Sequence, residues 1–384
     1  MRRIFISTCE YSGDMHGEAL ITELKKLEPE LEIYGVGGSR MANAGMELIL
    51  DPTKLSTIGF IEALKNFRRL KRLIREIVSE WEKRRPDVVV WLDSWAFNLE
   101  LAKAAKKMGI PVVCIFSPSA WAYGAGRAKR VAENVTQLLA VLPFEADFYR
   151  KYGVRTEYIG HPLYDRVQAT MTAIEFRAKY NLDPEAKILA LLPGSRRQEI
   201  ARLLPVMLDT VKKLDYQEPL QLVLPVAGSI DRSWLETLIS ESSLSVRLIE
   251  KDVYNLMAAA DAAIIASGTA TLEAALLGVP MVIVYQVTKL SYFIYKRLQT
   301  AEHKAQRPWM IGLPNLIAGS QIVPEIIQHD LTPENVLKQL EPLLNNRETN
   351  LKVRAQLNEI RERVGPAGVM SRAATKIIGL IDEV

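Results

Sequence analysis

The 384-residue chain has few of the side chains that most often bind metals or form disulfides. It contains four histidines and two cysteines, Cys9 and Cys114, each of which falls in an apparent buried strand. Neither residue type has the spacing of a zinc site, and two separated cysteines provide no disulfide framework. We therefore expect reduced thiols, a cytosolic protein and no metal site.

Long apolar runs and several catalytic signatures are also missing. No run approaches the roughly 18 apolar residues of a membrane-spanning helix, and the N-terminal residues do not resemble a signal peptide. The chain has no P-loop, no complete dinucleotide-binding glycine motif, no nucleophile elbow and no H-E-x-x-H. Its net charge of only +4 does not favour a nucleic-acid partner.

Short apolar segments alternate with helical patterns along the whole chain. Most of these segments are continuously apolar, which is typical of parallel strands covered on both faces. Because the chain is long for a single core, we predict an α/β protein with two doubly wound, Rossmann-like domains facing a cleft. The expected strands are residues 2–8, 31–37, 87–93, 111–117, 138–143, 156–160, 188–195, 220–226, 246–250, 262–267 and 280–285.

A polar stretch without a strand, residues 161–185, separates the two halves. We place a linker near 162–168 and predict domains at 1–165 and 166–350. Residues 351–384 are expected to be a helical segment that can cross back onto the first domain.

Small residues end a buried strand and open a helix in the segment 262–280. Ser267, Gly268 and Thr269 would place backbone N–H groups at the helix N-terminus, where the helix dipole also attracts phosphate. Glu273 follows one turn later on the same face and could accept hydrogen bonds from ribose hydroxyls. Ordinary capping with an exposed glutamate is the alternative.

The segment 188–200 repeats this strand–turn–helix plan. Gly194 and Ser195 form the turn, and Arg196 follows where an anionic group would lie. The planar fork of an arginine can bond two phosphate oxygens. For the adjacent Arg197, exposure to solvent at the start of a helix is nearly as good an explanation as binding of an anionic group.

The stretch STCEYSGDMHG, residues 7–17, places Glu10, Ser12, Gly13 and Asp14 at the mouth of the first helix. A single cap residue would suffice there, so the second carboxylate needs another explanation. Asp93 ends another buried strand, where a general base would face a cleft, although it could instead cap the next helix.

Two further features lie near the expected cleft. Trp121 and Tyr123, in a small-residue loop with Ser119, could stack on a sugar or base, although a packed loop would look similar. His161 stands at the domain junction, where a lone histidine is more often structural than catalytic.

Residues 58–78 predict a basic amphipathic helix with its apolar residues in one stripe. Such a helix can lie in a membrane interface and be attracted to anionic lipid. Packing of the stripe on the first sheet is the alternative. A lipid substrate would favour the membrane, at least around residues 58–67.

Taken together, these residues resemble the lipid-A-disaccharide synthase family along nearly the whole chain. The motifs that carry the resemblance are EYSGD at 10–14, GVGGSRM at 35–41, SPSAWAY at 117–123, LPFE at 142–145, YIGHP at 158–162, LLPGSRRQEI at 191–200, ASGTATLEAALLGVPMVIVY at 266–285 and LPNLIAG at 313–319.

The resemblance implies a GT-B glycosyltransferase. Its donor would be UDP-2,3-diacylglucosamine, its acceptor 2,3-diacylglucosamine 1-phosphate, and its product the β-1,6-linked lipid A disaccharide, formed with inversion. Members work at the inner face of the cytoplasmic membrane without redox cofactor or tightly bound metal. The resemblance is compatible with a protein that forms a homodimer.

The residues that match the family motifs give a set of expected site residues. The catalytic candidates are Asp93, Glu10 and Asp14, with Asp93 as the favoured base; the substrate-binding candidates are Ser12, Gly13, Ser119, Trp121, Tyr123, His161 and Asn315; the UDP-binding candidates are Gly194, Ser195, Arg196, Ser267, Gly268, Thr269 and Glu273.

Three departures from the family pattern lie on the acceptor side: Tyr11 replaces a small residue or Thr, Trp95 and Ala96 replace Pro and Asp, and residues 124–128 are extra. Two alternatives stay open for this reason. One is another UDP-GlcNAc enzyme of the same shape, either a 2-epimerase or a peptidoglycan-type transferase. The other is a relative that binds nucleotide or lipid without catalysis.

Overall fold

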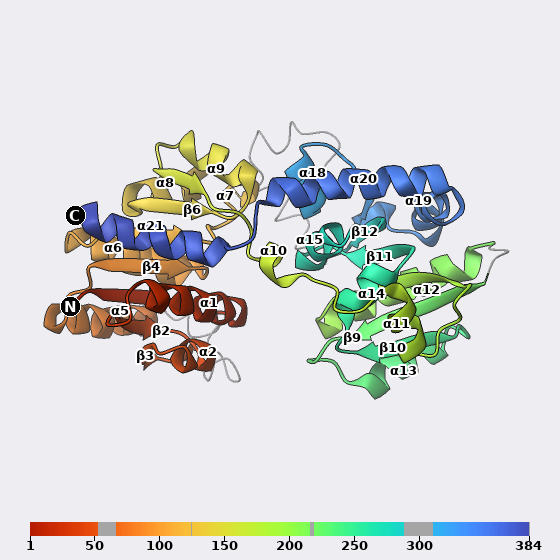
Figure 1. The fold of residues 1–384 in the computed structure, drawn as a ribbon, viewed down its shortest axis with the longest axis horizontal. Helices are drawn as coiled ribbons and strands as arrows, with labels where there is room; N and C mark the ends of the chain where they lie inside the picture. The colour runs from red at the N-terminus through yellow and green to blue at the C-terminus, as the bar shows by residue number, and fades with distance from the viewer. Residues whose placement is uncertain (53–66, 124, 216–218, 288–309, 384) are drawn as a thin grey trace. The chain divides into compact units, whose positions relative to one another are not determined.

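The computed structural model describes residues 1–52, 67–123, 125–215, 219–287 and 310–383. These residues form two compact units (Figure 1). The first contains Met1 to Pro162 and the segment that begins at Gly365, and the second runs from Leu163 to Val364. The expected helical segment 351–384 is therefore divided between the two units at Gly365.

The first unit is built on a parallel sheet with the strand order β3-β2-β1-β4-β5-β6-β7. Its strands are β1 (Arg3–Ser7), β2 (Glu32–Val36), β3 (Glu47–Leu50), β4 (Val88–Leu92), β5 (Val112–Ile115), β6 (Gln137–Ala140) and β7 (Thr156–Tyr158). Its helices are α1 (Tyr11–Leu27), α2 (Ser39–Asn43), α5 (Phe67–Lys83), α6 (Trp95–Lys107), α7 (Ala120–Tyr123), α8 (Ala125–Asn134), α9 (Pro143–Arg150) and α21 (Val369–Glu383).

The second unit repeats the plan with the order β10-β9-β8-β11-β12-β13, again parallel. Its strands are β8 (Lys187–Leu192), β9 (Leu220–Val226), β10 (Val246–Glu250), β11 (Ala262–Ala266), β12 (Met281–Tyr285) and β13 (Glu325–Ile327). Its helices are α10 (Leu163–Arg166), α11 (Ala173–Lys179), α12 (Arg197–Lys213), α13 (Arg232–Ser240), α14 (Val253–Ala259), α15 (Thr269–Leu276), α18 (Leu313–Ala318), α19 (Pro333–Asn345) and α20 (Arg347–Val364), with a 3₁₀ turn at Gln328–Asp330.

The predicted fold class is confirmed, and every expected strand is present. The sequence missed β3 and β13, two short edge strands that are only partly buried and so lack a continuous apolar signal. Each sheet reverses its strand order beside a central strand, so β1 lies next to β4 and β8 next to β11. Ligands of doubly wound sheets bind outside the carboxyl ends of such strand pairs.

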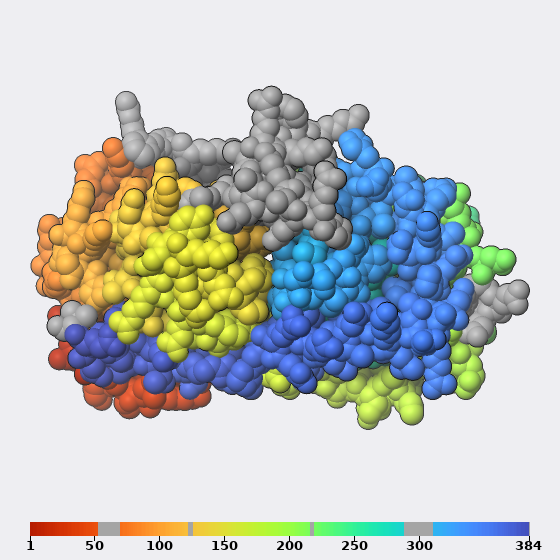
Figure 2. Space-filling view, turned by 90° about the horizontal axis from the view of Figure 1, so that it is seen from above, coloured from red at the N-terminus to blue at the C-terminus, as the bar shows by residue number. Residues whose placement is uncertain are grey.

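The C-terminal helix does return to the first unit, as expected. Helix α21 packs against α1, and Figure 2 shows the dark blue end of the chain on the surface of this unit. The Arg372 guanidinium secures this return by donating to the carbonyls of Ile159, Pro366 and Ala367 at 2.7–3.0 Å. Gly365 has φ +100°, and a Cβ there would lie 3.1 Å from the Cα of Gly160.

Helix α5 gives the apolar stripe of residues 70–81 a structural role. Leu70, Ile77 and Trp81 are buried in the core of the first unit, and the Trp81 ring meets Phe5 edge-on at 5.1 Å between centroids. Over these residues the alternative of packing on the sheet is correct. Residues 58–66 of the expected membrane-facing turns, and the Phe67 side chain, lie outside the described part. No described helix has the length and apolar content needed to cross a membrane.

Candidate active site

Asp93 lies at the carboxyl end of β4, beside the end of β1, as the strand pattern predicts. Both Asp93 (φ +51°) and Ser94 (φ +49°) have left-handed backbone conformations, which are costly for residues other than glycine. The buried Asn98 stabilises this turn, because its amide donates to the carbonyl of Asp93 at 2.9 Å and to that of Leu92 at 3.1 Å. The turn directs the carboxylate toward the end of β1.

The Asp93 carboxylate is held by groups that the sequence did not single out. Its Oδ2 accepts a 2.8 Å hydrogen bond from the Thr8 hydroxyl, and its Oδ1 accepts from the Ser94 hydroxyl. Burial raises the pKa of Asp93 to about 7; the charge of Glu10 also raises this pKa, and the hydrogen bonds from Ser94 and Thr8 lower it. The result is a carboxyl group that exchanges its proton near neutral pH.

Gly13 allows the first turn of α1 to approach Asp93. A Cβ at this position would lie 1.9 Å from both the Asp93 Oδ2 and the Thr8 Oγ1 atoms. No side chain fits there, so this glycine shapes the site by leaving room for the carboxylate. Ser12, one residue earlier in the same turn, is exposed.

Glu10 and Asp14 have different environments although both belong to the EYSGD turn. Glu10 is the exposed N-cap residue of α1, and its carboxylate makes no capping hydrogen bond. Asp14 is 2% exposed and accepts from the backbone N–H groups of Gly38, Arg40 and Met41 at 2.8–3.2 Å. It therefore caps the start of α2, whereas Glu10 is available to a ligand.

The next expected substrate contacts are Ser119, in the loop between β5 and α7, and Trp121, in α7. The Trp121 indole N–H donates to Glu145 Oε1 at 3.3 Å, and its ring meets Phe144 edge-on. Glu145 is 4% exposed, and its Oε2 has no hydrogen-bond partner among the described residues. Burial raises the pKa of Glu145 to about 7. The side chain of Tyr123 lies outside the described part of the chain.

His161 follows the end of β7 and is held neutral. Burial lowers its pKa to about 3, and His16 of α1 contributes to this lowering. The His16 ring in turn stacks on Phe116 at 4.3 Å between centroids. Neutral imidazoles in this position can donate or accept hydrogen bonds without adding charge.

The residues expected to bind a nucleotide line one cavity of about 870 Å³ in the second unit. Gly194, Ser195 and Arg196 lie beyond β8, and the other predicted residues lie beyond β11 or in the first turns of α15. Gly268 has φ +159° with open space in front of it. The cavity therefore occupies the expected point of strand-order reversal and reaches the N-terminus of α15. The lining residues that the sequence did not single out include Ala227, Gly228, Arg232, Lys251 and Met257.

Two charged residues of this cavity, Glu273 and Arg196, have side-chain partners. The Tyr254 hydroxyl donates to Glu273 Oε1 at 2.9 Å, while burial raises the pKa of Glu273. Arg196 pairs with Glu199 at 3.0 Å and stays largely exposed, whereas Arg197 stacks on Trp234 at 4.7 Å. Of the two arginines, Arg196 is the one that lines the cavity.

Asn315, an expected substrate contact, is fully buried. Its Oδ1 accepts from the N–H groups of Ile322 and Val323, and its Nδ2 donates to Val323 O and to Glu325 Oε1, all at 2.6–3.0 Å. All of its hydrogen-bonding capacity is thus used to join α18 to β13 and to the residues just before that strand. The structure gives this residue a structural role.

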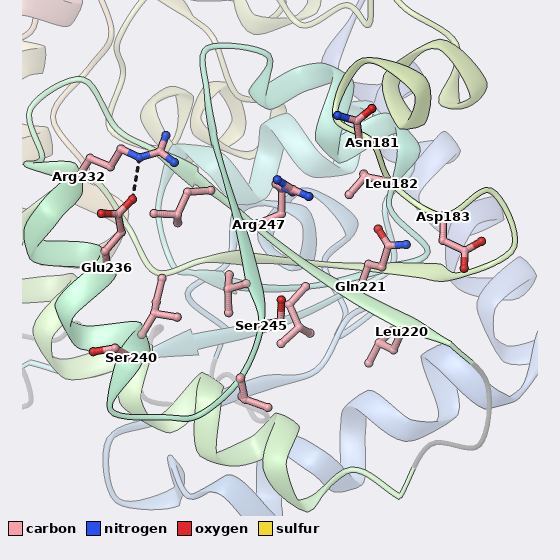
Figure 3. A pocket seen from close by; sticks show the side chains of 15 residues that line it. Asn181, Leu182, Asp183, Leu220, Gln221, Arg232, Glu236, Ser240, Ser245 and Arg247 are labelled. Atoms are coloured by element: carbon pink, nitrogen blue, oxygen red, sulfur yellow. Dashed lines mark hydrogen bonds and ion pairs between the residues drawn. The ribbon is translucent and has the colours of Figure 1, made fainter.

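A second cavity, of about 730 Å³, lies over β9 and β10 at the edge of the same sheet (Figure 3). Arg232 and Glu236 of α13, joined at 2.9 Å, face Arg247 of β10 and Gln221 of β9 across it. No expected site residue lines this cavity. Among the described residues, no cluster of three or more His, Cys, Asp or Glu side chains could hold a metal ion.

Two doubly wound units with these turns define the GT-B class of fold, and the solved structures similar to this chain agree. UDP-GlcNAc 2-epimerase from Neisseria meningitidis bound to UDP-GlcNAc has a TM-score of 0.65 at 14% identity, with 100% of each chain covered. The calicheamicin glycosyltransferase CalG4 has a TM-score of 0.62 at 15% identity, covering 100% of this chain and 98% of its own. At such identities the likeness shows the fold alone.

Sequence comparison identifies the family within this class. The family model for lipid-A-disaccharide synthetase matches residues 4–376, and the chain belongs to this family, as the motifs predicted. The lipid-A-disaccharide synthase of Geobacter metallireducens is 37% identical over 99% of this chain and 97% of its own length. That of Syntrophotalea carbinolica is 38% identical over 100% of this chain and 96% of its own.

The different environments of Asp14 and Glu10 predict different effects on stability. Asp14→Ala removes the acceptor for three backbone N–H groups and should lower the free energy of unfolding by about 2 kcal/mol. Glu10→Ala removes an exposed carboxylate and should change it by less than about 0.5 kcal/mol. Urea unfolding of both variants measures the difference. Equal stabilities would contradict the structural role of Asp14.

Proposed function

We propose that this chain is an inverting glycosyltransferase that joins UDP-2,3-diacylglucosamine to 2,3-diacylglucosamine 1-phosphate and releases UDP. Full-length membership of the lipid-A-disaccharide synthetase family is the observation that carries this proposal. Mass spectrometry of the products made from these two substrates tests it directly. A product other than the β-1,6-linked disaccharide, such as an epimerised UDP-sugar, would refute it.

Asp93 is the proposed general base. In a single displacement, the acceptor hydroxyl attacks the anomeric carbon while the bond to the diphosphate breaks, and a base removes the hydroxyl proton. A base is most effective when its pKa lies close to the working pH, and the pKa of Asp93 is raised to about 7. Glu10 is exposed beside it and is proposed to contact the acceptor.

The cavity beyond β8 and β11 is the proposed donor site. The N-terminus of α15 and the Arg196 guanidinium supply positive potential for a diphosphate, which carries more charge as it leaves. Glu273, oriented by Tyr254, would accept hydrogen bonds from the ribose hydroxyls. UDP is named as a ligand of several structures with this fold, which supports the same type of donor here.

The lipid substrates imply work at a membrane surface. Lys71, Arg72 and Arg75 are exposed on α5, while the apolar side chains of this helix from Leu70 to Trp81 are buried or partly buried against the core. Such a cationic face is suited to contact with anionic lipid headgroups without insertion of the helix. We propose this face as part of the membrane contact.

Asp93→Asn should lower kcat by about two decades or more, which is the range for a lost general base. In the parent, kcat should fall as the pH drops below about 7, because protonation of Asp93 removes the base. The raised pKa also means that ionising Asp93 costs stability as pH rises from about 4 toward 7. The variant should therefore unfold at no lower urea concentration than the parent at pH 8. Near-normal kcat in Asp93→Asn would contradict its role as the base.

Arg196→Ala and Glu273→Ala should each weaken UDP binding by roughly 1.5–3 kcal/mol, the range for a hydrogen bond to a charged group. Arg247→Ala, in the cavity over β9 and β10, is the matched control and should leave the affinity unchanged. Isothermal titration calorimetry measures all three. Unchanged UDP affinity in both cavity variants would remove the donor-site assignment.

Replacing Arg72 and Arg75 together with Ser should reduce binding to anionic vesicles at low salt, because each surface cation contributes about 1 kcal/mol there. A double Ser variant at Lys212 and Lys213 of α12 keeps the same charge change and should bind like the parent. Cosedimentation with vesicles measures both. Equal binding by the two variants would exclude the α5 face as the membrane contact.

A further inference from the structure

Tyr11, the first residue of α1, presents its aromatic ring to solvent. Its exposure is 67%, whereas most large apolar side chains of the described chain are buried. An exposed ring of this size gains free energy when a ligand covers it. Its place in the molecule indicates which ligand does so.

The ring is held in place from one side. The Arg40 guanidinium lies 5.7 Å from the Tyr11 ring centroid, and its Nη2 donates to the Tyr11 hydroxyl at 3.3 Å. Glu18 fixes Arg40 in turn, through a 3.0 Å bond from Nη1. A side chain that is already ordered loses little conformational entropy when it binds a partner.

Tyr11 also stands next to the groups proposed to act on the acceptor. It follows Glu10 directly, and it lies two residues before Gly13, where an added Cβ would lie 1.9 Å from the Asp93 Oδ2 atom. Tyr11 and Glu10 are both exposed in the turn that opens α1, so a molecule bound at this turn can contact both side chains.

We propose that Tyr11 is a specificity-determining residue whose ring stacks on the pyranose of the acceptor, with Arg40 as the positioning residue. This inference rests on the proposed function. A pyranose has an apolar C–H face and polar edges, which match an aromatic ring that contacts Arg40 and follows Glu10 in the chain. An acyl chain would meet charged side chains there, and Glu10 together with Glu18, which is paired with Arg40, opposes the attraction of Arg40 for a phosphate group.

Steady-state kinetics with 2,3-diacylglucosamine 1-phosphate as the varied substrate tests this proposal. Tyr11→Ala and Tyr11→Leu, which both lack a flat ring, should raise the acceptor KM about tenfold, with kcat changed less than about twofold. Tyr11→Phe keeps the ring and should raise the KM less than about threefold. Leu27→Ala, an exposed apolar residue at the other end of α1, is the matched control and should behave like the parent. UDP affinity should be the same in all of these proteins.

Several results would overturn the stacking role. They are an acceptor KM in Tyr11→Ala equal to that of Leu27→Ala, a Tyr11→Leu variant that matches Tyr11→Phe, or a loss confined to kcat or UDP affinity. A parent that makes no disaccharide would overturn this inference and the proposed function together. A parent that makes disaccharide while Tyr11→Ala keeps its KM would refute the stacking alone.

Discussion

The close approach of α1 to the end of β4 is the constraint on which the site of the first unit depends. Only a residue without a Cβ lets the helix start lie against Asp93, and Gly13 occupies that position. The contact buries the carboxylate, and burial is the main reason why its pKa rises to about 7. Thr8 and Ser94 then limit the rise by donating hydrogen bonds. The close approach of the α1 start at Gly13 thus determines the protonation behaviour of the Asp93 carboxyl group.

The second unit uses the same topological position for a different purpose. There the ends of β8 and β11 form turns of small residues, and the space in front of them is a cavity of about 870 Å³. The helix that follows β11 directs its N-terminal N–H groups toward this space, which favours an anion. Parallel sheets with the same reversal of strand order thus give a buried carboxylate in one unit and an open pocket at a helix N-terminus in the other.

Residues that look alike in the sequence have unlike roles in the structure. Glu10 and Asp14 stand four positions apart in one motif. Glu10 is exposed, whereas Asp14 caps the start of α2, which lies about 25 residues further along the chain. Arg196 and Arg197 are neighbours, but one lines the cavity and the other stacks on Trp234. The apolar stripe predicted over residues 58–78 can suit a membrane interface or a sheet, and its part from Leu70 to Ile77 packs in the core of the first unit.

The sequence by itself determined the α/β class, the buried strands and the family, because these depend on local apolar runs and on ordered motifs. It also placed Asp93 and the small-residue turns at strand ends, since a strand end is a local feature. Tertiary structure alone decided which polar groups meet. Asp14 reaches the backbone at residues 38–41, Asn315 joins α18 to β13, and Tyr254 orients Glu273. Each of these contacts joins residues that no spacing rule connects, because their distance depends on how the helices pack on the sheet.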